Sequence, residues 1–369
     1  MAAGASMRIE GAGCEVRVDL GARSYPIVIG AGLLAEVGPR LAAAGYQGRC
    51  ALVTSERVGA LYREPVLASL GGAGFSPVAI EIPDGEQHKN LAWLAVLYDR
   101  LLDAGVERRS PLVALGGGVI GDLAGFAAAT LLRGLPLVQV PTTLLGQVDA
   151  AIGGKTGVDH ALGKYLIGAF HQPRLVVVDV STLRSLPRRE FVAGLAEVIK
   201  YAVIRDAELF ATLEAQLDGL LGLDVSVLVP VVASCCEHKA AVVAADEREE
   251  SGERAVLNFG HTVGHALEVL TEYRRLRHGE AVAIGMMAAA RVSQARGLCP
   301  AATVERLERL VRRAGLPTEI PDDVTAPALA LAMQTDKKKA AGRIRFICVE
   351  AIGRTRMVEL SAQQVAEQL

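Results

Sequence analysis

The sequence predicts an α/β domain with a parallel sheet, followed by a mostly α-helical domain. Between residues 16 and 178, short apolar runs rich in β-branched residues alternate with longer helical patterns. Near-continuous apolar strands separated by helices are typical of a parallel sheet buried on both faces. After Pro187 the strand signals end and helical periodicity takes over. A chain of 369 residues is long enough for two domains, which we expect at residues 1–180 and 181–369.

The N-terminal elements follow one another in a regular order. The expected strands are RCALVTS, SPVAIEI, PLVALG, LVQVP and RLVVVDV. The expected helices begin near Val58 and then cover residues 91–104 and 121–132, where apolar residues recur three or four apart. This alternation is the pattern of strand–helix–strand units, in which each helix crosses one face of the sheet.

The C-terminal half is expected to be helical with one exception. Its helical segments cover residues 189–203, 206–217, 225–246, 259–270, 280–296 and 302–314. The exception is the pair of runs RIRFICV and TRMVEL, which predicts a small β-hairpin near the C-terminus.

Composition and charge exclude several classes of protein. With 39 Lys and Arg against 41 Asp and Glu, a net charge of -2 leaves no basic field for nucleic acid or an anionic membrane. No run approaches the ~18 consecutive apolar residues of a membrane span, and the first residues lack the apolar core of a signal peptide. The six cysteines are scattered without a C-x-x-C pair, as in a reducing compartment. We therefore expect a cytoplasmic protein with a small-molecule substrate.

A glycine-rich run, LGGGVIGD, follows an apolar strand and opens a helix. Glycines let a pyrophosphate approach the backbone, and N–H groups at a helix start face the anion. Gly116, Gly118 and Gly121 match the spacing of a dinucleotide fingerprint, but the run comes late in the domain and no ribose-binding acid follows it. The loop PDGEQHK offers Glu86 and Lys89 instead. A nucleotide site and a tight turn that only packs the helix both remain open.

A polar stretch follows the next strand. It contains Thr142 and Thr143, then DAAIGGKTG, then Gly163 and Lys164. Hydroxyls, glycines and two lysines suit anions and a polyol, although a solvated loop has the same composition. The GGKT piece is not a P-loop, because Asp149 stands where that motif requires glycine. We therefore do not expect ATP hydrolysis.

A glutamate and histidines of the helical half form a metal-type pattern. Glu197 and Lys200 lie three residues apart on one helical face, and His261 and His265 lie four apart. His278 opens the next helix. One carboxylate and two or three imidazoles on packed helices can bind zinc with open coordination positions. Any one of these histidines alone fits a core or surface position equally well.

Basic residues complete the pattern. Arg133, Lys239 and Arg254 stand among apolar neighbours, and residues 337–339 are a run of three lysines that also fits a solvated face. A nucleotide cradle, a metal-type set and many cations together indicate a small, multiply anionic substrate beside a nicotinamide and a Lewis acid.

These residues carry a resemblance to the 3-dehydroquinate synthase family of sugar phosphate cyclases. The resemblance runs from about Val16 to Val349 and rests jointly on DGEQHK, GGGVIGDLAGFAAAT, VPTTLLGQVDAAIGGKTGV, GAFHQP, GLAEVIKY, DERE, LNFGHTVGHALE and HGEAVAIGM. It implies the dehydroquinate synthase-like fold, with an NAD-binding α/β domain and a helical metal- and substrate-binding domain. It implies conversion of 3-deoxy-arabino-heptulosonate 7-phosphate to 3-dehydroquinate and phosphate in the shikimate pathway of aromatic amino acid biosynthesis. The cofactors would be recycled NAD and divalent zinc or cobalt, in a homodimer.

The resemblance also implies which residues form the site. The metal ligands would be Glu197, His261 and His278. The NAD-binding residues would be Asp84, Gly85, Glu86, Gln87, His88, Lys89, Gly118, Val119, Ile120, Gly121, Asp122, Thr142, Thr143, Lys155, Lys164, Thr182, Leu183, Arg184 and Ser185. The substrate-binding and catalytic residues would be Arg133, Asp149, Lys155, Lys200, Lys239, Arg254, Asn258, His265 and one lysine of the pair 337–338.

The family's chemistry gives this set a physical purpose. The C5 hydroxyl is oxidised with help from the metal, and the new ketone acidifies the neighbouring C–H so that phosphate can leave. Reduction, ring opening and an intramolecular aldol reaction then close the carbocycle. Lysines and Arg133 would hold phosphate and carboxylate, while His265 and Asn258 would orient water or move a proton. The substrate phosphate itself is a candidate base.

One position departs from the family pattern, and alternatives remain. The family reads Gly-Lys-Asn-Leu-Ile-Gly where this chain has Tyr165 after Lys164, so a substrate contact is lost or replaced there. Other cyclases of the superfamily make deoxy-scyllo-inosose or epi-valiolone, and glycerol dehydrogenase-like enzymes share the fold. A non-catalytic NAD-binding module is a third alternative. The unbroken motifs, with Lys239 and Arg254 placed for a carboxylate, favour dehydroquinate, and a simple dehydrogenase would need fewer phosphate-binding cations.

Overall fold

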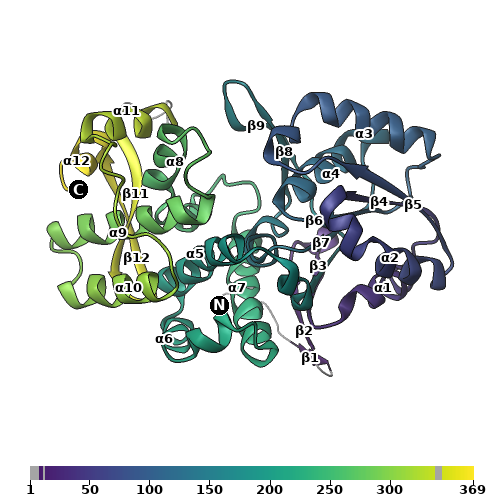
Figure 1. Cartoon of the computed structure of the whole chain (residues 1–369), viewed down its shortest axis with the longest axis horizontal. Coiled ribbons are helices and arrows are strands. Elements are labelled where there is room, and N and C mark those ends of the chain that lie inside the picture. The colour runs from purple at the N-terminus through teal and green to yellow at the C-terminus, as the bar shows by residue number, and fades with distance from the viewer. Residues whose placement is uncertain (1–7, 11–12, 337–342) are drawn as a thin grey trace. The chain divides into compact units, whose positions relative to one another are not determined.

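The computed structural model describes residues 8–10, 13–336 and 343–369 (Figure 1). The chain divides into two compact units. The N-terminal unit is Met1–Leu186 with Leu228–Arg248, and the C-terminal unit is Pro187–Val227 with Glu249–Leu369. The predicted boundary near residue 180 is close to the first crossing, but the segment Leu228–Arg248 packs with the N-terminal unit.

An eight-stranded sheet forms the centre of the N-terminal unit, in the order β1-β2-β3-β10-β7-β6-β4-β5. The six strands from β3 to β5 pair in parallel, as the sequence predicts, while β1, β2 and β3 pair antiparallel at one edge. The central strands β6, β7 and β10 are buried along their whole length, which explains their continuous apolar runs. The strands are β1 (Arg8–Glu10), β2 (Gly13–Val18), β3 (Tyr25–Gly30), β4 (Gly48–Ser55), β5 (Phe75–Ile82), β6 (Leu112–Gly116), β7 (Leu137–Pro141) and β10 (Leu175–Asp179).

Helices cover both faces of this sheet. Apolar residues of α1 (Val37–Ala43) and α2 (Glu56–Gly72) join one buried cluster, and those of α3 (Leu91–Asp103) and α4 (Gly118–Thr130) join another. The hydroxyl of Ser55 accepts the Val58 N–H to cap α2, and the Asn90 side chain accepts the Trp93 N–H to cap α3. These capped helices fix where the loops after the strands begin and end.

A second, two-stranded sheet was not expected from the sequence. Strand β8 (Lys155–His160) pairs antiparallel with β9 (Gly163–Phe170), in the region predicted only as a polar stretch. Glycines and charged residues along both strands interrupt the alternation of apolar and polar residues that normally identifies a hairpin. The hairpin contributes the predicted residues Lys155 and Lys164.

The C-terminal unit is mainly helical, which confirms the prediction. A hairpin of β11 (Arg343–Ala351) and β12 (Arg354–Ser361) also forms where the sequence predicts one. Helices α11 and α12 were not predicted, and α9 begins two residues earlier than expected, at His278. The helices are α5 (Arg188–Arg205), α6 (Ala207–Leu221), α8 (His261–Leu270), α9 (His278–Ala295), α10 (Ala301–Arg313), α11 (Ala326–Asp336) and α12 (Ala362–Ala366).

Helix α7 (Val225–Ala245) forms where the sequence predicts a helix, but most of it does not belong to the C-terminal unit. Most of it packs with the N-terminal unit, where the Cys236 thiol donates to the Gln147 carbonyl at 3.4 Å and Lys239 contacts Asp149. Among the described residues it is the one helix long and apolar enough, by length and composition alone, to cross a membrane. Of its most apolar stretch, 56% is buried within the structure, and core helices of soluble proteins meet the same criterion. It is therefore weak support for a membrane span.

Candidate active site

Three helices of the C-terminal unit bring the predicted metal ligands together. Glu197 is fully buried in the middle of α5, while His261 and His278 are the first residues of α8 and α9. Each offers a ligand atom, and these atoms all lie within 4.8 Å of one another. The Nε2 atoms of His261 and His278 each lie 3.6 Å from Oε1 of Glu197.

The other nitrogen of each imidazole is held by a protein acceptor. Nδ1 of His261 lies 3.2 Å from the Phe259 carbonyl, and Nδ1 of His278 lies 3.1 Å from the Glu268 carboxylate. When each ring is neutral with its proton on Nδ1, both Nε2 atoms face Glu197 and can offer a lone pair to an ion. One carboxylate and two imidazoles with oriented lone pairs are a donor set that fits zinc or cobalt and leaves positions open for substrate.

Burial and charge shift the pKa values of the two histidines in opposite directions. Burial, reinforced by nearby cations, lowers the pKa of His261 to about 3, so its imidazole is neutral. Burial alone would lower the pKa of His278 too, but hydrogen bonds to Glu197 and Glu268 raise it to about 10. Cation binding at this site is therefore coupled to the release of a proton.

Lys200 lies one helical turn after Glu197 and forms a buried ion pair with it. The Lys200 ammonium contacts Oε2 of Glu197, and the two side chains are 2% and 0% exposed. Buried charges are stable only when they are paired. Lys200 therefore supplies a positive charge that compensates for the burial of the Glu197 carboxylate.

The remaining predicted residues of the C-terminal unit lie on α8 and the 3-10 helix η7 (Glu253–Asn258) before it. The His265 ring lies 5.3 Å from the His261 ring and 6.0 Å from the His278 ring, between centroids, so it belongs to the same cluster. Arg254 is buried and lies 3.5 Å from Glu249, whereas Asn258 is exposed at the end of η7.

Sequence reasoning missed one residue of this cluster. Glu268 is buried and contacts His278, and its carboxylate also lies within reach of His265. The signal was present in the sequence, because Glu268 follows His265 by three residues and His261 by seven, which places all three on one face of α8.

Close packing of α9 against α5 holds His278 near Glu197. A Cβ atom on Gly279 would lie 1.8 Å from the Ala193 carbonyl oxygen, which is backbone and cannot move aside. We expect Gly279→Ala to lower the free energy of unfolding by about 3 kcal/mol, because overpacking must push the helices apart. Urea unfolding measures this, and zinc affinity should fall with it.

Gly71→Ala is the matched control for this substitution. Gly71 lies in α2 with nothing within 4 Å of the added Cβ, so the change should stabilise by at most about 1 kcal/mol through helix propensity. Equal effects of the two substitutions would contradict the packing argument.

The N-terminal unit places the predicted glycine loop at the start of α4. The first turn of a helix leaves N–H groups without intrahelical acceptors, and here these groups belong to Gly118, Val119 and Ile120. The N–H of Gly121, the next residue, donates to the Gly117 carbonyl at 3.0 Å. The loop after β7 packs against it. The Thr142 N–H donates to the Gly116 carbonyl at 3.0 Å, and a Cβ on Gly117 would lie 2.9 Å from the Thr143 methyl group.

Lys89 connects three segments of the predicted NAD site. Its buried ammonium lies 3.0 Å from Glu86, 3.4 Å from Asp122 and 3.7 Å from Asp159. Lys164 of β9 also lies 3.2 Å from Glu86. The loop before α3, the first turns of α4 and the hairpin of β8 and β9 are thus held together by charge.

These contacts set the protonation of the two acids. Burial would raise the pKa of Glu86, but Lys89 and Lys164 lower it to about 2, so the carboxylate is ionised and can accept hydroxyl hydrogen bonds. Burial raises the pKa of Asp122 to about 6 despite Lys89. In the same loop, Asp84 accepts at its carbonyl from Gln87 at 3.3 Å and lies 2.9 Å from Nδ1 of His88.

The segment of Thr182, Leu183, Arg184 and Ser185 forms most of the 3-10 helix η6 (Val180–Ser185). The Tyr62 hydroxyl donates to the Thr182 carbonyl at 3.1 Å and lies 2.6 Å from the Ser185 hydroxyl. Buried Gln147 donates to the Thr182 hydroxyl at 3.2 Å. The segment is therefore anchored at both ends.

The predicted substrate residues of the N-terminal unit are held in different ways. The Lys239 ammonium donates to the Asp149 carboxylate at 2.7 Å and to its carbonyl at 2.6 Å. Lys155 is exposed at the start of β8. Arg133 is also exposed and has a left-handed backbone, with φ of 66°, next to Leu132 at 51°. Two consecutive such residues cost about 1 kcal/mol each or more and are common at ligand sites.

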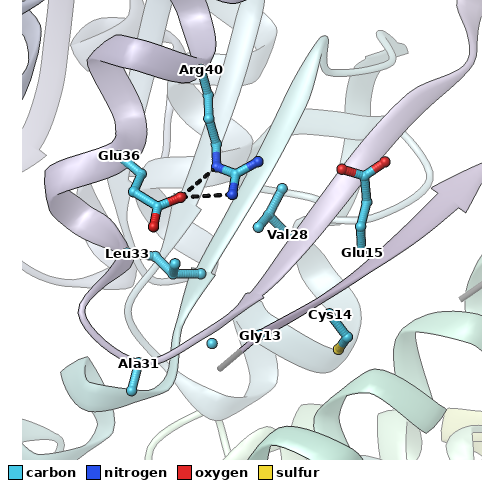
Figure 2. Close-up of a pocket in the computed structure, with 9 residues that line it drawn as sticks. Gly13, Cys14, Glu15, Val28, Ala31, Leu33, Glu36 and Arg40 are labelled. Atoms are coloured by element: carbon cyan, nitrogen blue, oxygen red, sulfur yellow. Dashed lines mark hydrogen bonds and ion pairs between the residues drawn. The ribbon is translucent and has the colours of Figure 1, made fainter. Parts of the chain in front are cut away.

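Two of the sequence-based predictions concern positions outside the described part of the chain. Residues 337–338 and the Tyr165 side chain lie outside what the structure describes. A pocket of the N-terminal unit, between β2, β3 and α1, contains none of the predicted residues (Figure 2). Figure 2 shows Glu36 and Arg40 paired along its wall, with Glu15 and Cys14 opposite. It is separate from the site described above.

Comparison with known proteins decides the family. Two family models, described as 3-dehydroquinate synthase N-terminal and C-terminal, match residues 79–193 and 194–339. The 3-dehydroquinate synthase of Pelobacter propionicus is 53% identical over 348 residues, covering 94% of this chain and 96% of that protein. The chain belongs to the 3-dehydroquinate synthase family. The family member from Synechococcus is 48% identical over 359 residues, covering 96% and 97% of the two chains.

Solved structures agree with this family. A 2-epi-5-epi-valiolone synthase from Streptomyces hygroscopicus, with NAD+ and Zn2+ bound, superposes with a TM-score of 0.85 at 29% identity, covering 93% of this chain and 95% of that one. A 2-deoxy-scyllo-inosose synthase with carbaglucose-6-phosphate, NAD+ and Co2+ has a TM-score of 0.84 at 24% identity, covering 96% and 98%. At 24% identity, the similarity to the 2-deoxy-scyllo-inosose synthase shows only that this chain has the same fold.

Proposed function

We propose that this chain converts 3-deoxy-arabino-heptulosonate 7-phosphate into 3-dehydroquinate and phosphate, with NAD and a divalent zinc or cobalt ion. The observation that carries this proposal is the cluster of Glu197, His261 and His278, within 4.8 Å of one another, in a chain that has the family's motifs throughout. When bound, NAD accepts and returns a hydride, and the metal ion acts as a Lewis acid that lowers the pKa of a hydroxyl.

The N-terminal unit would bind NAD. The first turn of α4 would face the pyrophosphate with its N–H groups, and ionised Glu86 would accept hydrogen bonds from ribose hydroxyls. Lys89 would keep the segments around Glu86 in place, because it contacts all three of them. Thr142, Thr143 and the anchored segment 182–185 would complete the cradle.

Cations would hold the substrate's phosphate and carboxylate. This role is proposed for Arg133, Lys155, Lys239, Arg254 and one lysine of 337–338. Asp149 would orient Lys239, since it accepts from that ammonium at 2.7 Å. His265 lies beside both histidine ligands and would move a proton or orient water, with Asn258 as a second polar contact.

Release of phosphate tests this function. Purified protein with zinc and catalytic NAD should release one phosphate per heptulosonate phosphate and leave NAD unchanged in net amount. A folded, metal-loaded protein that releases none would overturn the proposal. Phosphate release from glucose 6-phosphate instead would indicate an inosose-type cyclase, and net NADH formation from glycerol would indicate a dehydrogenase.

The cellular compartment and the oligomeric state of the protein are proposed from its membership of the family. We propose a homodimer in the cytoplasm that binds neither nucleic acid nor membrane, in keeping with a net charge of -2. Light scattering coupled to size-exclusion chromatography measures the mass of the assembly, for which we expect twice the 38.8 kDa of the chain.

A further inference from the structure

We propose that Glu268 is a positioning residue that orients His278 as a metal ligand and raises the affinity of the site for the ion. Glu268 lies on α8, is 5% exposed, and brings Oε2 to 3.1 Å from Nδ1 of His278 on α9. Helix α8 therefore carries one proposed ligand, His261, at its first residue and the partner of the other ligand two turns later. This inference rests on the metal centre of the proposed function.

The position of Glu268 needs an explanation because a buried carboxylate is costly. Moving an ionised carboxylate from water into the protein interior costs several kcal/mol of free energy unless a charged or hydrogen-bonding partner compensates. The imidazole of His278 is such a partner. The contact therefore explains both why the carboxylate is tolerated and which way the His278 ring faces.

The two histidines differ in how their rings are held. The Nδ1 partner of His261 is the Phe259 carbonyl, a backbone group only two residues away. The partner of His278 is a side chain from another helix, and the His278 side chain is 26% exposed. A carboxylate on Nδ1 fixes the tautomer and increases the basicity of Nε2. His278 depends on Glu268 for the orientation that His261 receives from its own backbone.

Direct ligation by Glu268 is the competing role. His265, Glu268 and His278 also offer atoms within 4.8 Å of one another. Glu268 and Glu197 approach opposite nitrogens of the His278 ring, Nδ1 and Nε2. An ion on the Nε2 side, where Glu197 and His261 converge, leaves Nδ1 and Glu268 to each other, and this favours the positioning role.

Competition with a chromophoric chelator tests the inference without measuring activity. Zinc affinity should fall about 10- to 100-fold in Glu268→Ala, with one ion still bound per chain. Glu268→Gln should lose less, because its amide oxygen still accepts from Nδ1 but carries no charge. The visible spectrum of bound Co2+ should keep its shape in Glu268→Gln, because the ligands are unchanged.

Glu214→Gln is the matched control. Glu214 is a carboxylate of the same unit that pairs with Arg306 at 2.6 Å and contacts no histidine, so its loss should leave zinc affinity within twofold of wild type. Wild-type affinity in both Glu268 variants would overturn the inference, as would loss of the bound ion or a changed Co2+ spectrum in Glu268→Gln. If the wild-type protein itself binds no zinc, the proposed metal centre fails and the inference fails with it.

Discussion

His261→Ala is expected to lower turnover at least about 10³-fold. The substitution removes one of three ligand atoms from the cluster with Glu197 and His278, and a Lewis acid contributes several kcal/mol to such a reaction. Steady-state phosphate release and zinc content together measure the effect. Both should fall, since the loss of activity follows from loss of the ion.

The fold should survive this change. His261 is the first residue of α8, where alanine is tolerated, and the proposed NAD-binding residues lie in the other unit. Circular dichroism and NAD binding should therefore match wild type. His160→Ala is the control, because His160 is an exposed histidine that accepts the Leu162 N–H on the turn of the β8–β9 hairpin. Full activity in a chelator-stripped His261→Ala protein would contradict the metal assignment.

Lys200→Ala is expected to lower kcat by at least about 10²-fold, and Lys200→Met separates the effect of charge from that of side-chain volume. Loss of Lys200 leaves the fully buried Glu197 without the ammonium that contacts it. Breaking a buried ion pair costs about 3 kcal/mol, and removing one positioned charge from an active site costs about 10²-fold in kcat. Urea unfolding and kcat should both change in Lys200→Met.

The stability loss should depend on the metal. In zinc-loaded protein the ion would neutralise Glu197 under the proposed assignment, so Lys200→Met should destabilise the fold less than it does after treatment with a chelator. Lys339→Ala is the control, and it should hardly change kcat or unfolding. A Lys200→Met protein with wild-type kcat and an unchanged unfolding free energy would show that the ion pair has neither role.

Much of the fold could be predicted from the pattern of apolar residues in the sequence. The buried strands β6, β7 and β10 are continuous apolar runs, so the parallel sheet was predictable. The hairpin of β8 and β9 was not predictable in this way. Ion pairs such as Lys164 with Glu86 stabilise it, and charged residues in a polar stretch normally indicate a loop.

The candidate site was predictable to a similar degree. Glu197, His261 and His278 come from separate helices. The residue pattern grouped them with His265 as a metal-type set, and the resemblance to a family then selected these three as ligands. Glu268 has the right spacing on α8, but a glutamate on a helix is usually solvated. Its burial beside His278 is a consequence of how α8 and α9 pack, which a single sequence does not state.

The membership of α7 in the N-terminal unit limits how the chain can be dissected. The chain passes between units after Leu186, Val227 and Arg248, so neither unit is one continuous stretch. A fragment that stops at Leu186 would lack Lys239 and expose the surface that α7 covers. On the ribosome, the N-terminal unit cannot finish folding until Arg248 has emerged, by which time the first helices of the other unit have already been synthesised.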